Sequence, residues 1–428
     1  MREMKDSGIE WIGQIPKGWE LRRAKTLFTQ RNSKGNGIEV LLSPTQKYGV
    51  VPQSQLEGVV QVKEDTDLQM FKTVHKGDFV ISLRSFQGGF EYSLYEGVCS
   101  PAYQVFYPTS PICDTYYRYL FKSQSFISKM NNLTVGIREG KNIQYVDFAN
   151  SQIPVPPLAE QERIAAFLDA ECAEIDAVLE KTRASIEEYK KLKQAVITQA
   201  VTKGIRGDRP MKDSGIEWIG EIANEFAVYK FKYLLKTPMQ YGANEAGITF
   251  DKTLPRYIRI TDITSDGRLK QDNRLCIEDT VAKPYILQDG DLLFARSGGT
   301  VGKSFLYKQS YGNAAFAGYL IRAVVNRTIA VPEYVYYYTN SSIYDTWKNS
   351  IFIQSTIQNI GADRYSNMPI IVPNNIEEQR SIVEYLNERC VGIDALIRKK
   401  QQYLTEIENY KKSLIYEYVT GKKEVHPL

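Results

Sequence analysis

Histidine and paired cysteines are scarce in this sequence, and their scarcity excludes several kinds of site. The 428 residues contain two histidines, His75 and His426, too few for a histidine-based metal cluster or catalytic pair. No two cysteines form a C-x-x-C pair, which argues against a zinc cluster and a disulfide framework and predicts reduced thiols. The five cysteines are Cys99, Cys113, Cys172, Cys276 and Cys390.

Long apolar runs are also missing. No segment approaches the roughly 20 uninterrupted apolar residues of a membrane helix, and no apolar signal segment follows residues 1–6. We therefore expect a cytoplasmic protein without membrane contact. An apolar content of 43% suffices for folded cores, and the length predicts two or three domains.

A large charge excess is absent as well. The net charge is +4, with 18 Lys and Arg against 15 Asp and Glu in residues 1–157 and 18 against 16 in residues 211–376. Charge alone is therefore weak evidence for a nucleic-acid partner.

Catalytic motifs are not evident. There is no Asn-Pro-Pro-Phe/Tyr motif for amino-methyl transfer and no glycine-rich methyl-donor loop. Residues 298–304 resemble a phosphate-binding loop, but Ser297 stands where that pattern requires glycine. The next residues, Phe305 to Tyr307, predict a strand where the pattern needs a helix. We expect a binding protein rather than an enzyme, although acid–base chemistry by carboxylates stays open.

What the sequence does contain is a double repeat. Residues Met4 to Gly13 recur unchanged as Met211 to Gly220, at an offset of 207 residues. A second set, which includes Glu160-Gln161 and Ile175-Asp176-Ala177, recurs at an offset of 218 as Glu378-Gln379 and Ile393-Asp394-Ala395. The blocks between these flanks share little sequence. This pattern favours two equivalent positions filled by two different modules, although a duplication followed by drift would also produce it.

The second repeat predicts two long helices. Apolar residues recur every three or four positions in residues 158–204 and again in residues 377–423, as in a heptad seam. Polar residues interrupt both seams at matching positions, namely Thr182 with Lys400 and Lys193 with Lys411. The repeat symmetry favours antiparallel pairing of the two helices within one chain. A simple coiled-coil spacer or dimerisation stalk would give the same seam.

The remaining residues, 1–157 and 205–376, predict two mixed α/β modules. Each contains a Gly-Asp pair before an apolar strand, Gly77-Asp78 and Gly290-Asp291, and each strand runs toward an Arg-Ser dipeptide. An aromatic helical stretch follows in each module, Tyr116 to Met130 and Tyr334 to Trp347.

These motifs resemble type I restriction-modification specificity subunits over essentially the whole chain. The resemblance rests on Gly8 to Ile12 with Ile15 to Trp19, on the two Gly-Asp pairs, and on Pro156 to Ile164 with its echo Glu377 to Ile382. The second copy departs from the pattern at residues 221–226, where Pro-x-Gly-Trp is lost.

The resemblance implies a non-catalytic protein made of two target-recognition domains, 1–157 and 205–376, and two spacer helices, 158–204 and 377–423, that form an antiparallel intramolecular coiled coil. Each domain would read one half of a bipartite site on double-stranded DNA. Two methyltransferase subunits and the restriction subunits would assemble around the chain. This chain would hold no cofactor, and S-adenosylmethionine would belong to the methyltransferase.

Candidate DNA-contacting residues follow from chemistry, because Arg suits guanine edges, Asn and Gln suit adenine edges, and Lys suits phosphates. In the first module the candidates are Arg84, Ser85, Gln87, Arg138, Lys141 and Asn142. In the second module they are Arg296, Ser297, Thr300, Lys303, Gln354 and Arg364. Two other interpretations stay open: a fused restriction or methyltransferase enzyme, and a coiled-coil scaffold with two globular heads.

Overall fold

The computed structural model describes residues 2–35, 40–56, 68–82, 89–133, 143–264, 267–353 and 358–425. They form two compact units, unit 1 with residues 1–183 and 402–428 and unit 2 with residues 184–401. Each unit combines one α/β module with segments of two long helices, α4 (Leu158–Lys203) and α9 (Ile376–Val419). Within the described ranges, no helix has the length and apolar character needed to cross a membrane.

The module of unit 1 is built on a four-stranded antiparallel sheet with the strand order β4-β11-β8-β9. Its core is rich in phenylalanine, and Phe28 alone contacts the rings of five other aromatic residues. The strands are β1 (Met4–Asp6), β2 (Gln14–Pro16), β3 (Glu20–Arg23), β4 (Phe28–Arg31), β5 (Leu42–Thr45), β6 (Gly49–Pro52), β7 (Lys72–Val74), β8 (Phe79–Ile81), β9 (Phe90–Tyr92), β10 (Gly97–Cys99), β11 (Gln104–Pro108) and β12 (Gln152–Val155). The helices are α1 (Asp114–Lys122), α2 (Gln124–Leu133) and α3 (Tyr145–Asn150).

The module of unit 2 repeats this sheet as β16-β23-β20-β21 and adds a second four-stranded sheet, β17-β19-β18-β22. The strands are β13 (Met211–Asp213), β14 (Glu221–Ala223), β15 (Phe226–Lys230), β16 (Gln240–Tyr241), β17 (Ile248–Thr249), β18 (Arg256–Ile258), β19 (Leu275–Cys276), β20 (Leu292–Ala295), β21 (Ser304–Leu306), β22 (Ala314–Phe316), β23 (Leu320–Ala323) and β24 (Pro369–Pro373). The helices are α5 (Asp279–Ala282), α6 (Pro332–Tyr338), α7 (Ser342–Ile353) and α8 (Ala362–Ser366). Two different modules are therefore built around the same kind of central sheet.

The predicted strands after the Gly-Asp pairs are confirmed as β8 and β20, which are buried along their whole length. The aromatic stretches, in contrast, are not single helices. Each is broken into two, α1 with α2 and α6 with α7, at Ser123 and Ser341. The buried hydroxyls of these serines donate to the carbonyls of Leu120 and Tyr338, both at 2.7 Å, so each serine closes its own turn.

In each unit the segments of α4 and α9 run antiparallel. In unit 1 the ring of Phe167 lies 4.5 Å from that of Tyr418, and Asp176 accepts from Lys411 at 2.6 Å. In unit 2 Lys193 donates to Asp394 at 2.7 Å, and the ammonium of Lys400 lies 5.7 Å from the ring centroid of Tyr189. Rising numbers on α4 thus meet falling numbers on α9, which confirms the predicted antiparallel pairing. The four-part division of the chain stays a prediction, because the compact units are defined by packing and contain parts of both helices.

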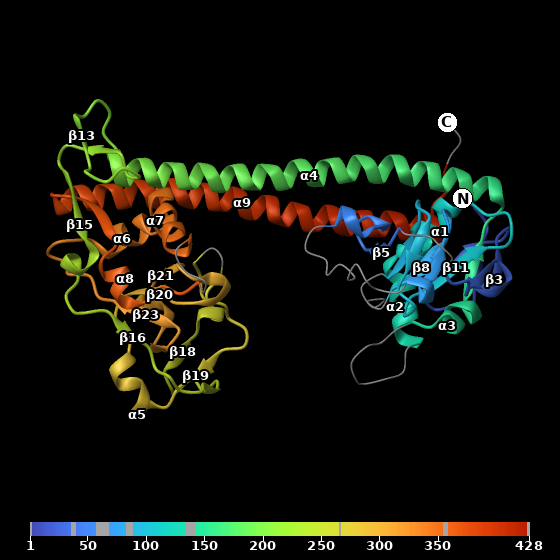
Figure 1. Cartoon of the computed structure of the whole chain (residues 1–428), viewed down its shortest axis with the longest axis horizontal. Coiled ribbons are helices and arrows are strands. Elements are labelled where there is room, and N and C mark those ends of the chain that lie inside the picture. The colour runs from blue at the N-terminus through green and yellow to red at the C-terminus, as the bar shows by residue number, and fades with distance from the viewer. Residues whose placement is uncertain are drawn as a thin grey trace. The chain divides into compact units, whose positions relative to one another are not determined.

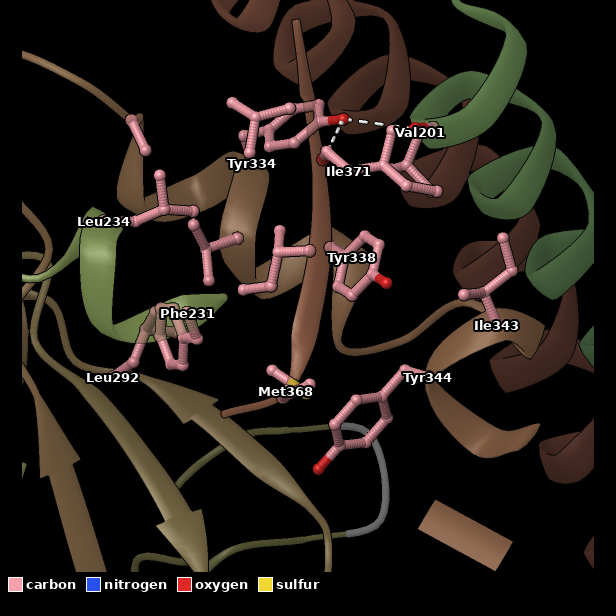
Figure 2. Packing of buried hydrophobic residues seen from close by; sticks show 14 of the residues in the cluster. Val201, Phe231, Leu234, Leu292, Tyr334, Tyr338, Ile343, Tyr344, Met368 and Ile371 are labelled. Atoms are coloured by element: carbon pink, nitrogen blue, oxygen red, sulfur yellow. Dashed lines mark hydrogen bonds between the residues drawn. The ribbon is translucent and has the colours of Figure 1, made fainter. Parts of the chain in front are cut away.

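The helix ends are bound to the modules by buried tyrosines at equivalent positions. Tyr116 of α1 donates to the carbonyl of Val419 at 2.7 Å in unit 1. Its counterpart 218 residues later, Tyr334 of α6, directs its hydroxyl at the carbonyls of Val201 and Ile371, at 3.2 and 3.0 Å in unit 2 (Figure 2). Figure 1 shows α6 and α7 beside the long helices in this unit. Each module therefore packs against the C-terminal end of one long helix.

Candidate nucleic-acid interface

The Gly-Asp pairs are structural and position the strands that lead to the candidate residues. Asp78 accepts from the backbone N–H of His75 at 2.8 Å, and Asp291 accepts from that of Gln288 at 2.9 Å. Each carboxylate is 2 to 3% exposed, so it closes a buried turn immediately before β8 or β20. The turn therefore fixes where each strand begins and where the residues after it emerge.

The cation beside each carboxylate comes from a different strand in the two modules. Arg31 of β4 donates to both oxygens of Asp78, at 2.7 and 3.0 Å. In unit 2 the cation is Arg322 of β23, whose guanidinium lies 3.7 Å from Asp291. Burial raises the pKa of Asp291, while the N–H of Gln288 and the charge of Arg322 lower it. The same turn is thus stabilised by non-equivalent arginines.

At the far end of β20, Arg296 meets two tyrosines. Its guanidinium lies over the ring of Tyr241, 5.1 Å from the centroid. The backbone N–H of Arg296 donates to the carbonyl of Tyr319 at 3.0 Å. Tyr241 is 42% exposed and Tyr319 is 62% exposed. Arg296 has no carboxylate within ion-pair distance in the described part of the chain. Its guanidinium is thus held by an aromatic face, with its hydrogen-bonding edge available to a ligand.

Two polar residues complete this group. Ser297 pairs with Asn359 as an isolated β-bridge, and the side-chain oxygen of Asn359 is buried without a hydrogen-bond partner in the structure as described. We call the five residues Tyr241, Arg296, Ser297, Tyr319 and Asn359 the Arg296 cluster. Aromatic faces, an uncommitted guanidinium and an amide are the groups that proteins use to stack on and read bases.

The structure describes five of the twelve predicted residues. Arg296 and Ser297 lie in the cluster, and Arg364 is exposed on α8, whose first N–H, that of Ala362, donates to the hydroxyl of Tyr241 at 3.0 Å. Thr300 and Lys303 lie in the connection from β20 to β21, where Lys303 lines a separate groove. Outside the described residues lie Arg84, Ser85, Gln87, Arg138, Lys141, Asn142 and Gln354.

Sequence reasoning missed Tyr241, Tyr319 and Asn359. The available signal was the pair of dipeptides Tyr241-Gly242 and Gly318-Tyr319, because a glycine beside an exposed aromatic residue often marks a close approach of two backbones. A Cβ at Gly242 would lie 2.3 Å from the carbonyl oxygen of Ala317. Only glycine fits there, so this approach brings both tyrosines to the same end of the sheet.

The Glu-Gln pairs at the starts of the long helices connect these helices to the modules. Gln161 is 2% exposed, accepts from the N–H of Cys113 at 3.0 Å and donates to the carbonyl of Pro156 at 2.8 Å. Gln379 makes the matching contacts with the N–H of Val331 and the carbonyl of Pro373, at 2.8 and 3.1 Å. Each glutamine thus ties the start of a long helix to the start of a module helix.

The neighbouring glutamates bind arginines that lie two residues before the two copies of the first repeat. Glu160 accepts from Arg2, and Glu378 accepts from Arg209, the counterpart of Arg2 at the offset of 207, at 2.7 Å. Asn375 caps the start of α9, since its side chain accepts from the N–H of Glu377 at 2.9 Å. These contacts give the glutamates a structural role that needs no partner protein.

No group of histidine, cysteine and carboxylate side chains suited to a metal ion occurs in the described part of the chain. Residues 298–300 form a short 3-10 turn and continue into strand β21, as predicted, so the helix that a phosphate-binding loop needs is not there. Burial raises the pKa of Cys172 and raises that of Cys390 to about 11, which keeps both thiols protonated within the helix pairs.

Comparisons with known proteins agree with this geometry. The family model described as type I restriction modification DNA specificity domain matches residues 16–188 and 256–408. The chain is 25% identical over 322 residues to the type I restriction enzyme EcoKI specificity subunit of Escherichia coli (strain K12), covering 74% of this chain and 67% of that protein. It is 25% identical over 298 residues to the MjaVIII specificity subunit of Methanocaldococcus jannaschii, covering 68% and 67%.

The fold also has a solved counterpart. A chain from a structure of a type I R-M system superposes with a TM-score of 0.67 at 16% identity, covering 96% of this chain and 99% of that one. At this level of identity the likeness establishes the fold, two α/β modules carried by two long helices.

Proposed function

The chain belongs to the type I restriction modification DNA specificity domain family, and on that premise we propose that it is the DNA specificity subunit of a type I restriction-modification system. It works in the cytoplasm, and each of its modules reads one half of a bipartite site on double-stranded DNA. The observation that supports this most directly is that the same supporting contacts occur twice in the chain. Equivalent contacts, Tyr116 with Val419 and Tyr334 with Val201, hold two modules that differ in content. A protein that recognises two different half-sites needs two modules that are held in the same way but differ in sequence.

Base reading in the second module is assigned to the Arg296 cluster. Arginine recognises guanine by donating two hydrogen bonds to its O6 and N7 atoms in the major groove, and its planar fork must be held in one orientation. The ring of Tyr241 supplies that orientation without consuming the donors. We therefore expect a guanine in the half-site that the second module reads.

The long helices act as the ruler between the half-sites. At 1.5 Å per residue, a helix of 46 residues is about 69 Å long. A helix of this length in water requires an apolar partner along its seam, and the antiparallel segments provide it in each unit. The number of residues in the helices then fixes the length of DNA between the two half-sites.

Two methyltransferase subunits bind this chain, one at each unit. The support is a pair of apolar side chains that remain exposed on the helices at equivalent positions. Val178 and Tyr410 are 40 and 54% exposed in unit 1, and their counterparts 218 residues away, Leu396 and Leu192, are 44 and 48% exposed in unit 2. Exposed apolar residues at matching places in two units fit two copies of one partner.

The chemistry belongs to those partners. S-adenosylmethionine supplies the methyl group within the methyltransferase subunits, and the restriction subunits join the same assembly. This chain acts by placing the target adenine, through the position of its modules on the DNA.

The decisive experiment co-expresses the chain with its methyltransferase and maps methylated adenines across the host genome. A bipartite motif with a fixed spacer is expected. Replacing residues 14–157 with another first module should change one half-site only, and inserting one heptad into both helices should lengthen the spacer and leave both half-sites intact. Methylation by the purified chain alone would favour a fused enzyme, and unaltered motifs after the module exchange would favour a scaffold.

A further inference from the structure

A groove of about 740 Å³ lies within unit 2, between the helix segments and the module. One wall consists of residues of α4 and α9. The other consists of α6, α7, the end of the β20–β21 connection, and Ile263, Thr264 and Gly267. Its polar floor includes Ser304 and Thr339, whose hydroxyls bond to one another at 2.7 Å.

The groove carries an excess of positive charge. Three carboxylates line it, and each has a lysine partner: Glu187 with Lys190, Asp345 with Lys348, and Asp394 with Lys193. Three further cations give the lining a net charge of about +3, and one of them, Lys191, is paired at 2.9 Å with Glu188, which does not line the groove. Those three are Lys191, Lys303 and Arg398. In a chain whose modules are nearly neutral, this is a local concentration of charge.

Lys303 is presented by a fixed turn rather than by a loose loop. Its backbone N–H donates to the carbonyl of Thr300 at 3.0 Å, and the hydroxyl of Tyr344 donates to the carbonyl of Gly302. Gly302 has a φ of +84° and lies against the aliphatic chain of Lys348, where a Cβ would come within 2.3 Å of Cδ. A side chain at that position would be excluded, so the turn that carries Lys303 is both specified and packed.

The same hairpin connects Lys303 to the base-reading cluster. The N–H of Ala295 donates to the carbonyl of Lys303 at 2.8 Å, and the N–H of Gly302 donates back to Ala295 at 3.0 Å. Arg296 therefore directly follows Ala295, which pairs with Lys303 across the hairpin. Paired strands lie about 4.8 Å apart. A ligand held by Lys303 would be positioned relative to Arg296 by a rigid backbone link.

The positive charge is a property of unit 2 and not of the repeated frame. The counterparts of Lys190, Lys191 and Arg398 in unit 1 are Glu408, Asn409 and Glu180. Helix pairing in unit 1 is maintained with acidic or neutral residues at these places, so pairing does not require the cations. Their presence in unit 2 calls for a ligand of negative charge.

We propose that this groove binds the phosphodiester backbone of the DNA beside the bases that the Arg296 cluster reads, and so supplies sequence-independent affinity in unit 2. The proposal rests on the function argued above and adds a second kind of contact to it. Phosphate contacts fix the register of a protein on DNA, while base contacts carry the sequence information. The phosphate contacts would come from Lys303, Lys191 and Arg398. The base contact would come from Arg296.

The test measures DNA affinity of the full chain, assembled with its methyltransferase, over a range of salt concentrations. The variants are Lys303→Ala, Arg398→Ala and Lys190→Ala combined with Lys191→Ala; Lys399→Ala, an exposed lysine of α9 that does not line the groove, is the control. Two duplexes of equal length serve as probes, one with the mapped site and one without it. Each lost phosphate contact should reduce the slope of log affinity against log salt by about 0.9.

The expected result is that the groove variants bind both duplexes more weakly by the same factor, while the methylated motif and the control variant are unchanged. Unchanged salt slopes in all groove variants would overturn the proposal. A changed motif in Lys303→Ala would also overturn it, since Lys303 would then read a base. If the unmodified chain fails to distinguish the two duplexes, the proposed function itself fails, whatever the groove variants do.

Discussion

Lys193 of α4 donates to both carboxylate oxygens of Asp394 of α9, at 2.7 Å each. Its counterpart in the other unit is the pair Lys411 and Asp176, with the donor and acceptor on the opposite helices, at 2.6 Å. The polar interruptions at Lys193 and Lys411 are therefore ion pairs that obey the repeat. Because Lys193 and Asp394 are only 27 and 30% exposed, removing one partner leaves a charge in a partly apolar seam.

This relationship predicts an asymmetry between single and double substitutions. Asp394→Asn should lower the free energy of unfolding by about 1–2 kcal/mol, because Lys193 loses its counter-charge. Lys193→Leu combined with Asp394→Leu should cost less or stabilise the protein, since two apolar side chains fill the seam. Chemical denaturation followed by circular dichroism measures both. A double variant that is less stable than the single one would show that the pair contributes net stability.

The buried tyrosines should be needed to hold the helix ends. Tyr334→Phe removes the donor to the carbonyls of Val201 and Ile371 and should cost about 1–3 kcal/mol, the usual loss for buried acceptors left without a partner. Tyr116→Phe should cost a similar amount through Val419. Tyr410→Phe, at an exposed position, is the matched control and should be neutral. Hydrogen exchange at the last turns of α4 and α9 would report the effect locally, and unchanged protection there would contradict it.

Arg296→Ala should relax the DNA motif at one position of one half-site. Loss of a two-bond contact to guanine reduces discrimination by about 1–3 kcal/mol, roughly 5- to 150-fold, at that base pair. Methylome mapping should show one degenerate position in the half-site that the second module reads. Arg380→Ala, which alters an exposed arginine paired with Glu377 on α9, should leave the motif intact. Degeneracy in the other half-site would refute the assignment.

Glu91 should make unit 1 sensitive to pH. Burial on β9 raises the pKa of this carboxyl to about 7, opposed by Lys122, and one of its oxygens has no hydrogen-bond partner within the described residues. The folded form then retains a proton that the unfolded form releases near pH 4.5. Stability contributed by this proton is complete below pH 4.5 and is lost as the pH rises through about 7.

Glu91→Gln should remove that dependence, since glutamine keeps a similar shape without a charge to bury. The difference in unfolding free energy between wild type and variant should change by roughly 2–3 kcal/mol between pH 5 and pH 8, in favour of the variant at pH 8. Lys122→Met should steepen the loss, because it removes the cation that stabilises the carboxylate. Parallel pH profiles for wild type and Glu91→Gln would rule the effect out.

Much of the frame could be predicted because its signals are periodic or repeated. Ile164, Leu168 and Cys172, which follow the apolar periodicity of residues 158–204, are buried, and so are Leu386 and Cys390 in the second helix. Further along α4, Val196 packs against the core of unit 2 and is partly buried, while its neighbour Ile197 is 2% exposed, because the module of unit 2 packs there and widens the face that is covered.

The candidate site was predictable only in part. Arg296 was found because it ends a recognisable buried strand, but the tyrosine that orients it comes from β16 and the asparagine beside it comes from the segment before α8. Lys303, grouped with Arg296 by sequence, lines a different surface. Proximity in the chain did not distinguish these two roles, because successive residues of a strand point to opposite faces and Arg296 follows Ala295, which pairs with Lys303.

The sequence by itself determined the doubled architecture, the two long helices, the Gly-Asp turns and the strands that follow them. These features depend on interactions between residues a few positions apart, which local periodicity and turn chemistry express directly. The tertiary structure decided which residues meet: Lys193 with Asp394, Gln161 with Cys113, Arg296 with Tyr241. These contacts depend on strand order and on the closure of long loops. Over such separations in sequence, the packing of the fold determines which side chains come together, and the neighbouring residues in the chain do not.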